Sequence, residues 1–175
     1  MIQTERLILR GWEDRDRAPF HAMGQDERVM ETLGPLLWRD EADALIDRMR
    51  AIEDANGFTF WAIERREDGA FIGFCGLKPG AEDTPIQGEV EIGWRLAFEH
   101  WGRGYAREAA QASLDWAWAN AIDSVAAITT PGNVRSWGLM ERLGMIRAPE
   151  HDFDHPKAID RLRSHWTYRI RRPAR

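Results

Sequence analysis

The chain has 175 residues, of which 43% are hydrophobic and 30% charged, a composition typical of a single globular domain spanning residues 1–175. A net charge of -5 argues against a nucleic-acid partner or an anionic membrane surface. No apolar run approaches the roughly 18 residues that cross a bilayer, and residues 1–17 lack the apolar centre of a signal peptide. The single cysteine, Cys75, indicates a reducing, cytoplasmic setting.

The first half of the chain mixes short strands with helices. Leu7 and Leu9 alternate with other residues as in a strand, and Gly24 interrupts a helical stretch. Asp40 is the expected N-cap of a longer helix, which Gly57 ends. In chain order, the predicted elements are a strand over 6–12, one or two short helices over 15–32, a helix over 40–57, and two strands over 58–66 and 70–79 joined by a turn at 67–69.

The second half begins with a loop rich in glycine, proline and acidic residues. Asn133 and Gly144 are typical of the start and the end of a short helix. The predicted elements are a strand over 89–98, an alanine-rich helix from about 104 to 121, a strand over 124–130, a helix over 133–144, and two last strands over 146–153 and 163–170. This order predicts a mixed α/β domain rather than a regular βαβ fold.

Two glycines separate the strand over 89–98 from the alanine-rich helix. Because glycine has no Cβ, the backbone at Gly102 and Gly104 can approach a bulky anion, and a helix N-terminus offers unpaired N–H groups. Arg103 and Arg107 add positive charge at the same place. These residues predict a cradle for a phosphate or pyrophosphate. The plain alternative is a tight strand-to-helix turn without a ligand.

Nucleotide-binding motifs fit this turn poorly. The sequence GRGYAR begins like G-x-G-x-x-G, but Arg107 stands at the third glycine, although Asp123 lies where a ribose-binding acid is expected. The preceding strand carries Glu89, Glu91 and Arg95, whereas a strand buried on both faces is almost continuously apolar. A nicotinamide-dependent oxidoreductase therefore stays only a third alternative.

The stretch EIGWRLAFEHWGRGYAREA resembles the acetyl-coenzyme A motif of the GNAT N-acetyltransferases, and most of all the ribosomal-protein N-acetyltransferase branch. TERLILR at the start, NVRSWGLMERLGM in the second half and HWTYRI near the end agree with it, so the resemblance covers nearly the whole chain. It implies a mixed α/β GNAT fold with a central, mostly antiparallel, twisted sheet of six to seven strands flanked by helices. It also implies acetyl-CoA as cofactor and a primary amine, on a small molecule or a protein N-terminus, as acceptor.

The resemblance further implies which residues bind the cofactor. The family signature is Arg or Gln, two residues, Gly, one residue, then Gly or Ala; Gly104 and Ala106 match, and Trp101 replaces the first residue, as in the ribosomal-protein branch. The backbone of 96–98 is expected to pair with the pantetheine arm, and the amides of 102–107 to hold the pyrophosphate. The implied cofactor-binding residues are Leu96, Ala97, Phe98, Trp101, Gly102, Arg103, Gly104, Tyr105, Ala106, Arg107 and Asn133.

Acetyl transfer to an amine needs a proton acceptor, because an ammonium group with a pKa near ~10 has no free lone pair. Glu91 is the expected base, with Glu89 second, either directly or through water. The alternative is that Glu91 pairs with Arg95 or faces solvent. A backbone N–H within 94–96 is the expected donor to the oxyanion.

The departing thiolate needs a proton donor. The tyrosine that many GNAT members use corresponds to Met140 here, so Ser136 is the expected acid, as in the ribosomal-protein branch. The alternative is that Ser136 makes a local hydrogen bond at the helix start. Loss of the tyrosine also leaves open a different class, a non-catalytic acyl-CoA-binding protein.

Several other residues have plain and functional interpretations. Glu150 and Asp152 are candidates for binding a cationic acceptor, and Trp38 is either a core residue or a wall of the acceptor pocket. Residues 151–155 lack the ligand separations of a structural zinc site, so no metal is expected. The identity of the acceptor and the oligomeric state, monomer or homodimer, stay open.

Overall fold

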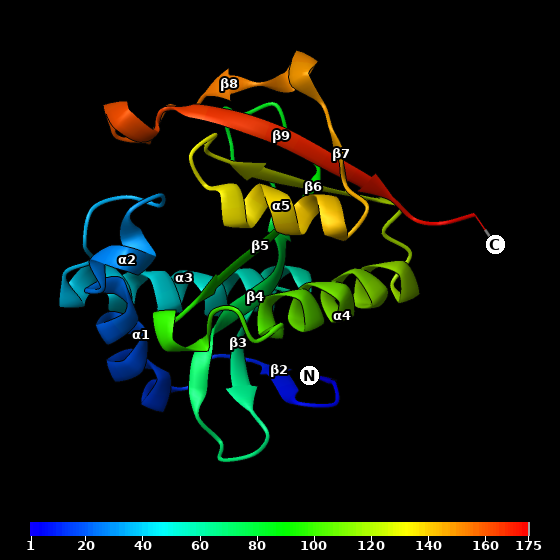
Figure 1. Ribbon diagram of the computed structural model, residues 1–175. Helices are drawn as coiled ribbons and strands as arrows, with labels where there is room; N and C mark the ends of the chain where they lie inside the picture. Colours follow the sequence, from blue (N-terminus) through cyan, green and yellow to red (C-terminus); the bar gives the residue numbers. More distant parts are fainter. Residues whose placement is uncertain (175) are drawn as a thin grey trace.

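A nine-stranded sheet with helices on both faces organises the computed structural model, which describes residues 1–174 (Figure 1). The strands are β1 (Ile2–Gln3), β2 (Leu7–Arg10), β3 (Phe60–Arg65), β4 (Phe71–Pro79), β5 (Val90–Leu96), β6 (Ser124–Thr129), β7 (Ile146–Arg147), β8 (Phe153–Asp154) and β9 (Ser164–Arg171). The helices are α1 (Arg17–Gly24), α2 (Glu27–Met30), α3 (Arg39–Asn56), α4 (Tyr105–Ala119) and α5 (Val134–Arg142). Short 3-10 turns are η1 (Asp14–Asp16), η2 (Phe98–His100), η3 (Pro149–His151) and η4 (Asp160–Leu162).

The strand order confirms the predicted fold class. The strands lie in the order β1-β2-β3-β4-β5-β6-β9-β7, and β8 pairs with β9 outside this path. Neighbours are antiparallel except β5 and β6, which are parallel. The sheet has more strands than the predicted six to seven, because β1, β7 and β8 are two residues long and too short to show an alternating pattern.

β5 and β6, the parallel pair of the sheet, separate after two paired residues. β5 pairs with β6 only at Val90 with Val125 and at Glu91 with Ala126, whereas its pairing with β4 continues to Leu96. The C-terminal part of β5 therefore has no neighbour on its β6 side. A gap opens in the middle of the sheet, beside the start of α4.

The core consists of two layers, one on each face of the sheet. On one face, Cys75 and Leu77 pack with Leu114 of α4 and Leu139 of α5. On the other face, a second cluster joins α1–α3 to the sheet through an aromatic group that includes Trp12, Phe60 and Phe74. Figure 1 shows α3 and α4 on opposite sides of the strands. No helix within residues 1–174 is long and apolar enough to cross a membrane.

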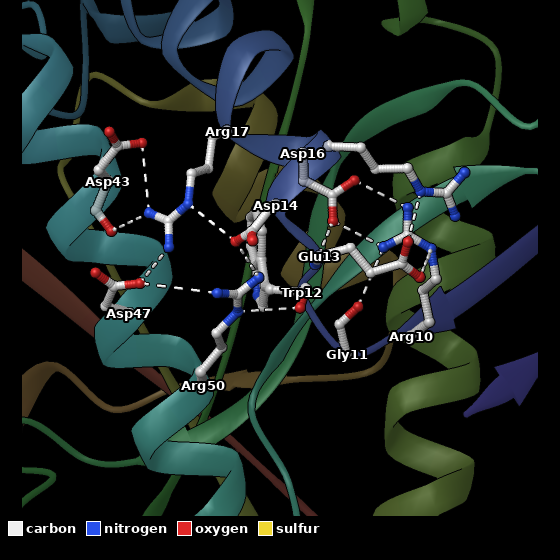
Figure 2. A network of polar contacts seen from close by, with 11 residues as sticks. Arg10, Gly11, Trp12, Glu13, Asp14, Asp16, Arg17, Asp43, Asp47 and Arg50 are labelled. Carbon is white, nitrogen blue, oxygen red and sulfur yellow. Dashed lines mark hydrogen bonds and ion pairs between the residues drawn. The ribbon is translucent and has the colours of Figure 1, made fainter.

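A polar network fastens the N-terminal strand to the helices of the second cluster (Figure 2). Arg10, which is 6% exposed, binds the carboxylate of the buried Asp16 at 2.7 and 2.9 Å. Arg50 of α3 donates to Asp14 at 3.0 Å and to the carbonyl of Trp12 at 3.1 Å. A buried ion pair is tolerated only when both charges are satisfied, so this network fixes how α1 and α3 sit against the sheet.

Three local expectations change in the structure. The long helix starts at Arg39 rather than after Asp40, because the Glu41 carboxylate accepts from the backbone N–H of Trp38 at 2.7 Å and makes Trp38 the N-cap. Trp38 itself is 74% exposed and is not a core residue. Residues 146–153 form β7, η3 and the first residue of β8 instead of one strand, with Pro149 at the start of the 3-10 turn.

Candidate acetyl-transfer site

The glycine turn has the geometry of an anion cradle. Gly102 and Gly104 have φ values of 72° and 82°, a left-handed conformation that favours glycine, and α4 starts directly after them. Within residues 1–174, none of the backbone N–H groups from 102 to 107 has an acceptor. Gly102, Arg103 and Gly104 are exposed, so these donors face solvent at the positive end of the α4 dipole. An anion bound here would satisfy them.

A polar clamp from the N-terminal segment holds this turn in place. Arg6 donates to the carbonyl of Arg103 at 3.0 Å and to the Glu108 carboxylate at 2.6 Å, and its guanidinium lies 4.6 Å from the centre of the Tyr105 ring. Thr4 donates to the same carboxylate at 2.6 Å. Burial raises the pKa of Glu108, but the hydrogen bonds from Thr4 and Arg6 outweigh it and lower that pKa below its ordinary value.

The clamp gives a physical reason why TERLILR and GRGYAREA occur together. Thr4 and Arg6 come from the first motif, and Glu108 comes from the second. Sequence reasoning did not assign a role to these three residues. The Thr-x-Arg spacing was the available signal, but only the fold places it against α4.

Beside the gap, the outer edge of β5 presents backbone groups that no neighbouring strand in residues 1–174 pairs with. Ala97 donates its N–H to the carbonyl of Ile72, in β4, at 3.0 Å. The N–H and C=O groups of successive residues in a strand point to opposite edges of that strand. The backbone groups of Trp94 and Leu96 therefore point to the gap, where β6 no longer pairs. The indole of Trp101 donates to the carbonyl of Leu96 at 2.8 Å, which links the strand end to the glycine turn.

Polar groups without partners occur on both strands that border the gap. On the β6 side, the hydroxyl oxygens of Thr129 and Thr130 are buried and have no hydrogen-bond partner within residues 1–174. On the β5 side, the N–H groups of Trp94 and Leu96 are available. Buried polar groups are usually satisfied, so a bound ligand with amide and carbonyl groups would supply the missing partners. A pantetheine arm has that chemistry.

The two expected bases lie at the end of the gap where β5 and β6 still pair, and both form ion pairs. Glu91 is 8% exposed, and its carboxylate contacts the Lys78 ammonium, which lies directly opposite on β4. The expected alternative partner of Glu91, Arg95, does not contact it. Glu89 accepts from Arg169 of β9 at 2.7 and 2.9 Å. Each of these carboxylates is therefore engaged by a cation from a neighbouring strand.

The start of α5 carries the other expected residues. The side-chain oxygen of Asn133 caps the helix by accepting from the backbone N–H of Ser136 at 3.2 Å. The Ser136 hydroxyl is only partly buried and makes no hydrogen bond to the described chain, residues 1–174. Met140 lies in the core and is 2% exposed. Neither tyrosine takes its place, because Tyr105 lies under Arg6, and the Tyr168 hydroxyl lies 3.3 Å from Glu141.

Two acidic candidates are placed differently from the expectation. Asp152 is engaged by Arg147 and by the backbone N–H of Thr167, and Glu150 lies in the η3 turn rather than on a strand. Within the described residues 1–174, no group of three or more His, Cys, Asp or Glu side chains is arranged to hold a metal ion. Cys75 is fully buried, and burial raises the pKa of its thiol to about 12.

Comparison with known sequences gives consistent similarities. Residues 6–146 match the acetyltransferase (GNAT) domain family. The chain is 35% identical over 146 residues to the uncharacterized protein YkkB of Bacillus subtilis, covering 82% of this chain and 84% of that protein. It is also 30% identical over 173 residues to the uncharacterized N-acetyltransferase p20 of Bacillus licheniformis, covering 92% and 90%.

Solved structures share the fold. An acetyltransferase from Agrobacterium tumefaciens superposes with a TM-score of 0.80 at 27% identity, covering 98% of this chain and 94% of that one. Spermidine N-acetyltransferase from Vibrio cholerae, solved with CoA and spermine, gives 0.74 at 22% identity, covering 96% of each chain. Ribosomal-protein-S5-alanine acetyltransferase from Vibrio fischeri gives 0.75 at 13% identity, covering 97% and 94%.

Proposed function

Because the chain belongs to the acetyltransferase (GNAT) domain family, we propose that it moves an acetyl group from acetyl-CoA to a primary amine by direct attack in a ternary complex. Membership in this family makes it an N-acetyltransferase with acetyl-CoA as its acetyl donor. The observation that carries the proposal is the row of unpaired N–H groups from 102 to 107, held at the gap in the sheet.

We assign the donor to the two sides of this gap. The amides of 102–107 would bind the pyrophosphate, aided by Arg103 and Arg107. The backbone of Trp94 and Leu96 would pair with the pantetheine arm, while Phe98 and Trp101 shape the path between arm and phosphates. Asn133 keeps a side-chain amide N–H₂ free for the same arm after capping α5. The bound donor supplies a reactive thioester.

The chain's own residues then manage protons and charge. The amine nitrogen attacks the thioester carbonyl carbon, the carbon–sulfur bond breaks, and the proton lost by nitrogen passes to Glu91 directly or through water. The N–H of Trp94 or Leu96 would stabilise the negative charge that develops on the carbonyl oxygen. The Ser136 hydroxyl would give a proton to the departing thiolate. Positioning of amine and thioester supplies much of the rate.

The acceptor is proposed to reach the thioester from the α1–α3 face, opposite α4. Lys78 and Glu91 open onto this face, because they lie directly opposite each other in the β4–β5 pairing and on the same side as Phe74 and Arg95. The neighbours named above act on spermidine and on a ribosomal protein, which supports a primary amine on a small molecule or a protein N-terminus. The ribosomal-protein branch remains part of this proposal.

The proposal covers residues 1–175 as one catalytic domain in the cytoplasm, where the lone thiol of Cys75 stays reduced.

The second candidate function is a non-catalytic acyl-CoA-binding protein. It is favoured by two observations: Met140 replaces the usual tyrosine, and both candidate bases are ion-paired. Size-exclusion chromatography would test the predicted homodimer.

The decisive experiment is the release of free thiol from acetyl-CoA over a panel of primary amines. Acceptor-dependent release supports the enzyme, whereas tight CoA binding without such release supports the binding protein. In active enzyme, Glu91→Gln should lower turnover most at mildly acid pH, where more of the amine is protonated. Lys78→Gln is the matched control, because it breaks the same ion pair and keeps the carboxylate. A constant ratio of Glu91→Gln to wild-type rates across pH would remove Glu91 from the role of base.

A further inference from the structure

One cation beside the proposed acetyl-transfer site has no partner. The side chain of Arg95 is partly buried, and its Nε and Nη1 atoms are fully buried and make no hydrogen bond within residues 1–174. The nearest contact of note is the ring of Phe74, whose centre lies 5.4 Å from the guanidinium carbon. A guanidinium has five N–H donors in a planar fork, and an aromatic ring cannot satisfy them.

The neighbouring cations on the same face of the sheet are all compensated. Lys78 pairs with Glu91, and Arg169 pairs with Glu89. Glu91 is four residues from Arg95 on the same strand, which places their Cα atoms ~14 Å apart at the usual rise per residue. Arg95 interacts with no carboxylate of residues 1–174, although a partly buried charge without a partner is destabilising.

The position of Arg95 places this charge on the acceptor side. Arg95 is opposite Phe74 on β4, and Phe74 belongs to the cluster under α1–α3. In the sequence, Arg95 lies between Trp94 and Leu96, whose backbone groups face the gap. Burial lowers the pKa of Arg95 to about 10, so the side chain is still protonated at neutral pH.

We propose that the acceptor amine also carries a carboxylate, and that Arg95 binds this carboxylate. The inference rests on the proposed acetyltransferase function and narrows its substrate class to amino acids and related amino-carboxylates. The planar fork of Arg95 matches a carboxylate in bidentate geometry and orients the amine toward the thioester. The same charge repels polyamines, whose second ammonium group would approach Arg95.

The test compares each amino acid with its own neutral amide. Glycine, β-alanine, 4-aminobutyrate and lysine sample several amine-to-carboxylate distances, and their amides keep size and amine. For the best-used pair, we expect kcat/KM for the acid to exceed that for the amide by roughly 10- to 100-fold, the effect of a charge-assisted hydrogen bond. Arg95→Gln should reduce this ratio to about one through KM, and Arg95→Lys should leave an intermediate ratio because it keeps charge without the fork.

Arg48→Gln is the matched control, since Arg48 is an exposed arginine on α3. Its acid-to-amide ratio should equal that of the wild type. The melting temperature of each variant checks folding, and Arg95→Lys keeps a cation over Phe74 if Arg95→Gln fails to fold. Equal use of acids and amides, or an unchanged ratio in Arg95→Gln and Arg95→Lys, would overturn the inference.

A second readout separates this inference from the proposed function. Calorimetry of N-acetyl-β-alanine and its amide, titrated into the CoA-bound protein, reports the carboxylate preference without turnover. If the protein acetylates spermidine or the amides best and binds both products equally, the function stands and the inference fails. If no amine supports thiol release although CoA binds, the proposed function fails, and the inference about an acceptor fails with it.

Discussion

A negative charge placed in the glycine cradle should abolish tight CoA binding with little loss of folding stability. Gly104 is the N-cap of α4, at φ 82°, among the unpaired N–H groups that are proposed to bind the pyrophosphate. In Gly104→Asp, a carboxylate would stand where the phosphates are expected. The matched control is Gly104→Asn, which has the same size and the same backbone strain but no charge.

The magnitude follows from Coulomb's law. One carboxylate at ~5 Å from one phosphate charge, at an effective dielectric constant of about 20, costs about 3 kcal/mol, or roughly a hundredfold in Kd. Arg6 lies close to the new side chain, with its Nη2 at 3.3 Å from the position of a Cβ at Gly104. Since Arg6 already pairs with Glu108 at 2.6 Å, it can offset only part of this repulsion.

Folding should be affected much less and to a similar extent in both variants. A left-handed residue other than glycine costs about 1–2 kcal/mol, and Asn and Asp tolerate this conformation best. Calorimetry with CoA at low and high salt measures the difference between the two variants, which should shrink as salt screens the repulsion. Equal CoA affinities of Gly104→Asp and Gly104→Asn at low salt would refute the assignment of the phosphates to this turn.

Three further predictions concern folding and reactivity. Gly102→Ala should lower the melting temperature by roughly 2–8 °C in a thermal scan, because the left-handed strain of about 1–2 kcal/mol has no contact to relieve it; an unchanged value would contradict the strained conformation. Arg10→Met should destabilise the protein by about 3–5 kcal/mol in urea unfolding, since it leaves Asp16 buried without its cation. The double variant Arg10→Met with Asp16→Leu should recover part of this loss. If it recovers nothing, the ion pair is not the cause of the loss. The raised pKa of Cys75, about 12, leaves roughly one thiol in ten thousand ionised at pH 8. A disulfide reagent should therefore react with Cys75 only after denaturation. Rapid labelling of the folded protein would contradict this prediction and show that the thiol is accessible.

The sequence predicted the fold class and the larger elements, because these have local signals. Alternating apolar residues mark β5, and Gly57 at φ 77° ends α3 where it was expected. Two-residue strands such as β7 and β8 have no such signal, since they form only because β9 lies beside them. The N-cap of α3 was misplaced by two residues because a side chain at Glu41 decides it.

The site was predictable only where backbone geometry depends on residue type. Glycine at 102 and 104 predicted a tight turn between strand and helix, and the structure has one, with both glycines left-handed. The partners of charged side chains depend on the neighbouring strands instead. Lys78 meets Glu91 through the β4–β5 register, and Arg95 is left alone by the same register, which no spacing within one strand could reveal.

The short contact between β5 and β6 divides the molecule into two parts that meet along very little backbone. One part, from β1 to β5, carries the cradle and its clamp with the help of α4; the other, from β6 to β9, carries Asn133 and Ser136. The Glu89–Arg169 ion pair links the two parts at this contact. Substitutions in the second part are consequently expected to change the width of the opening and the fit of the pantetheine arm, while the proposed phosphate cradle on the first part keeps its geometry.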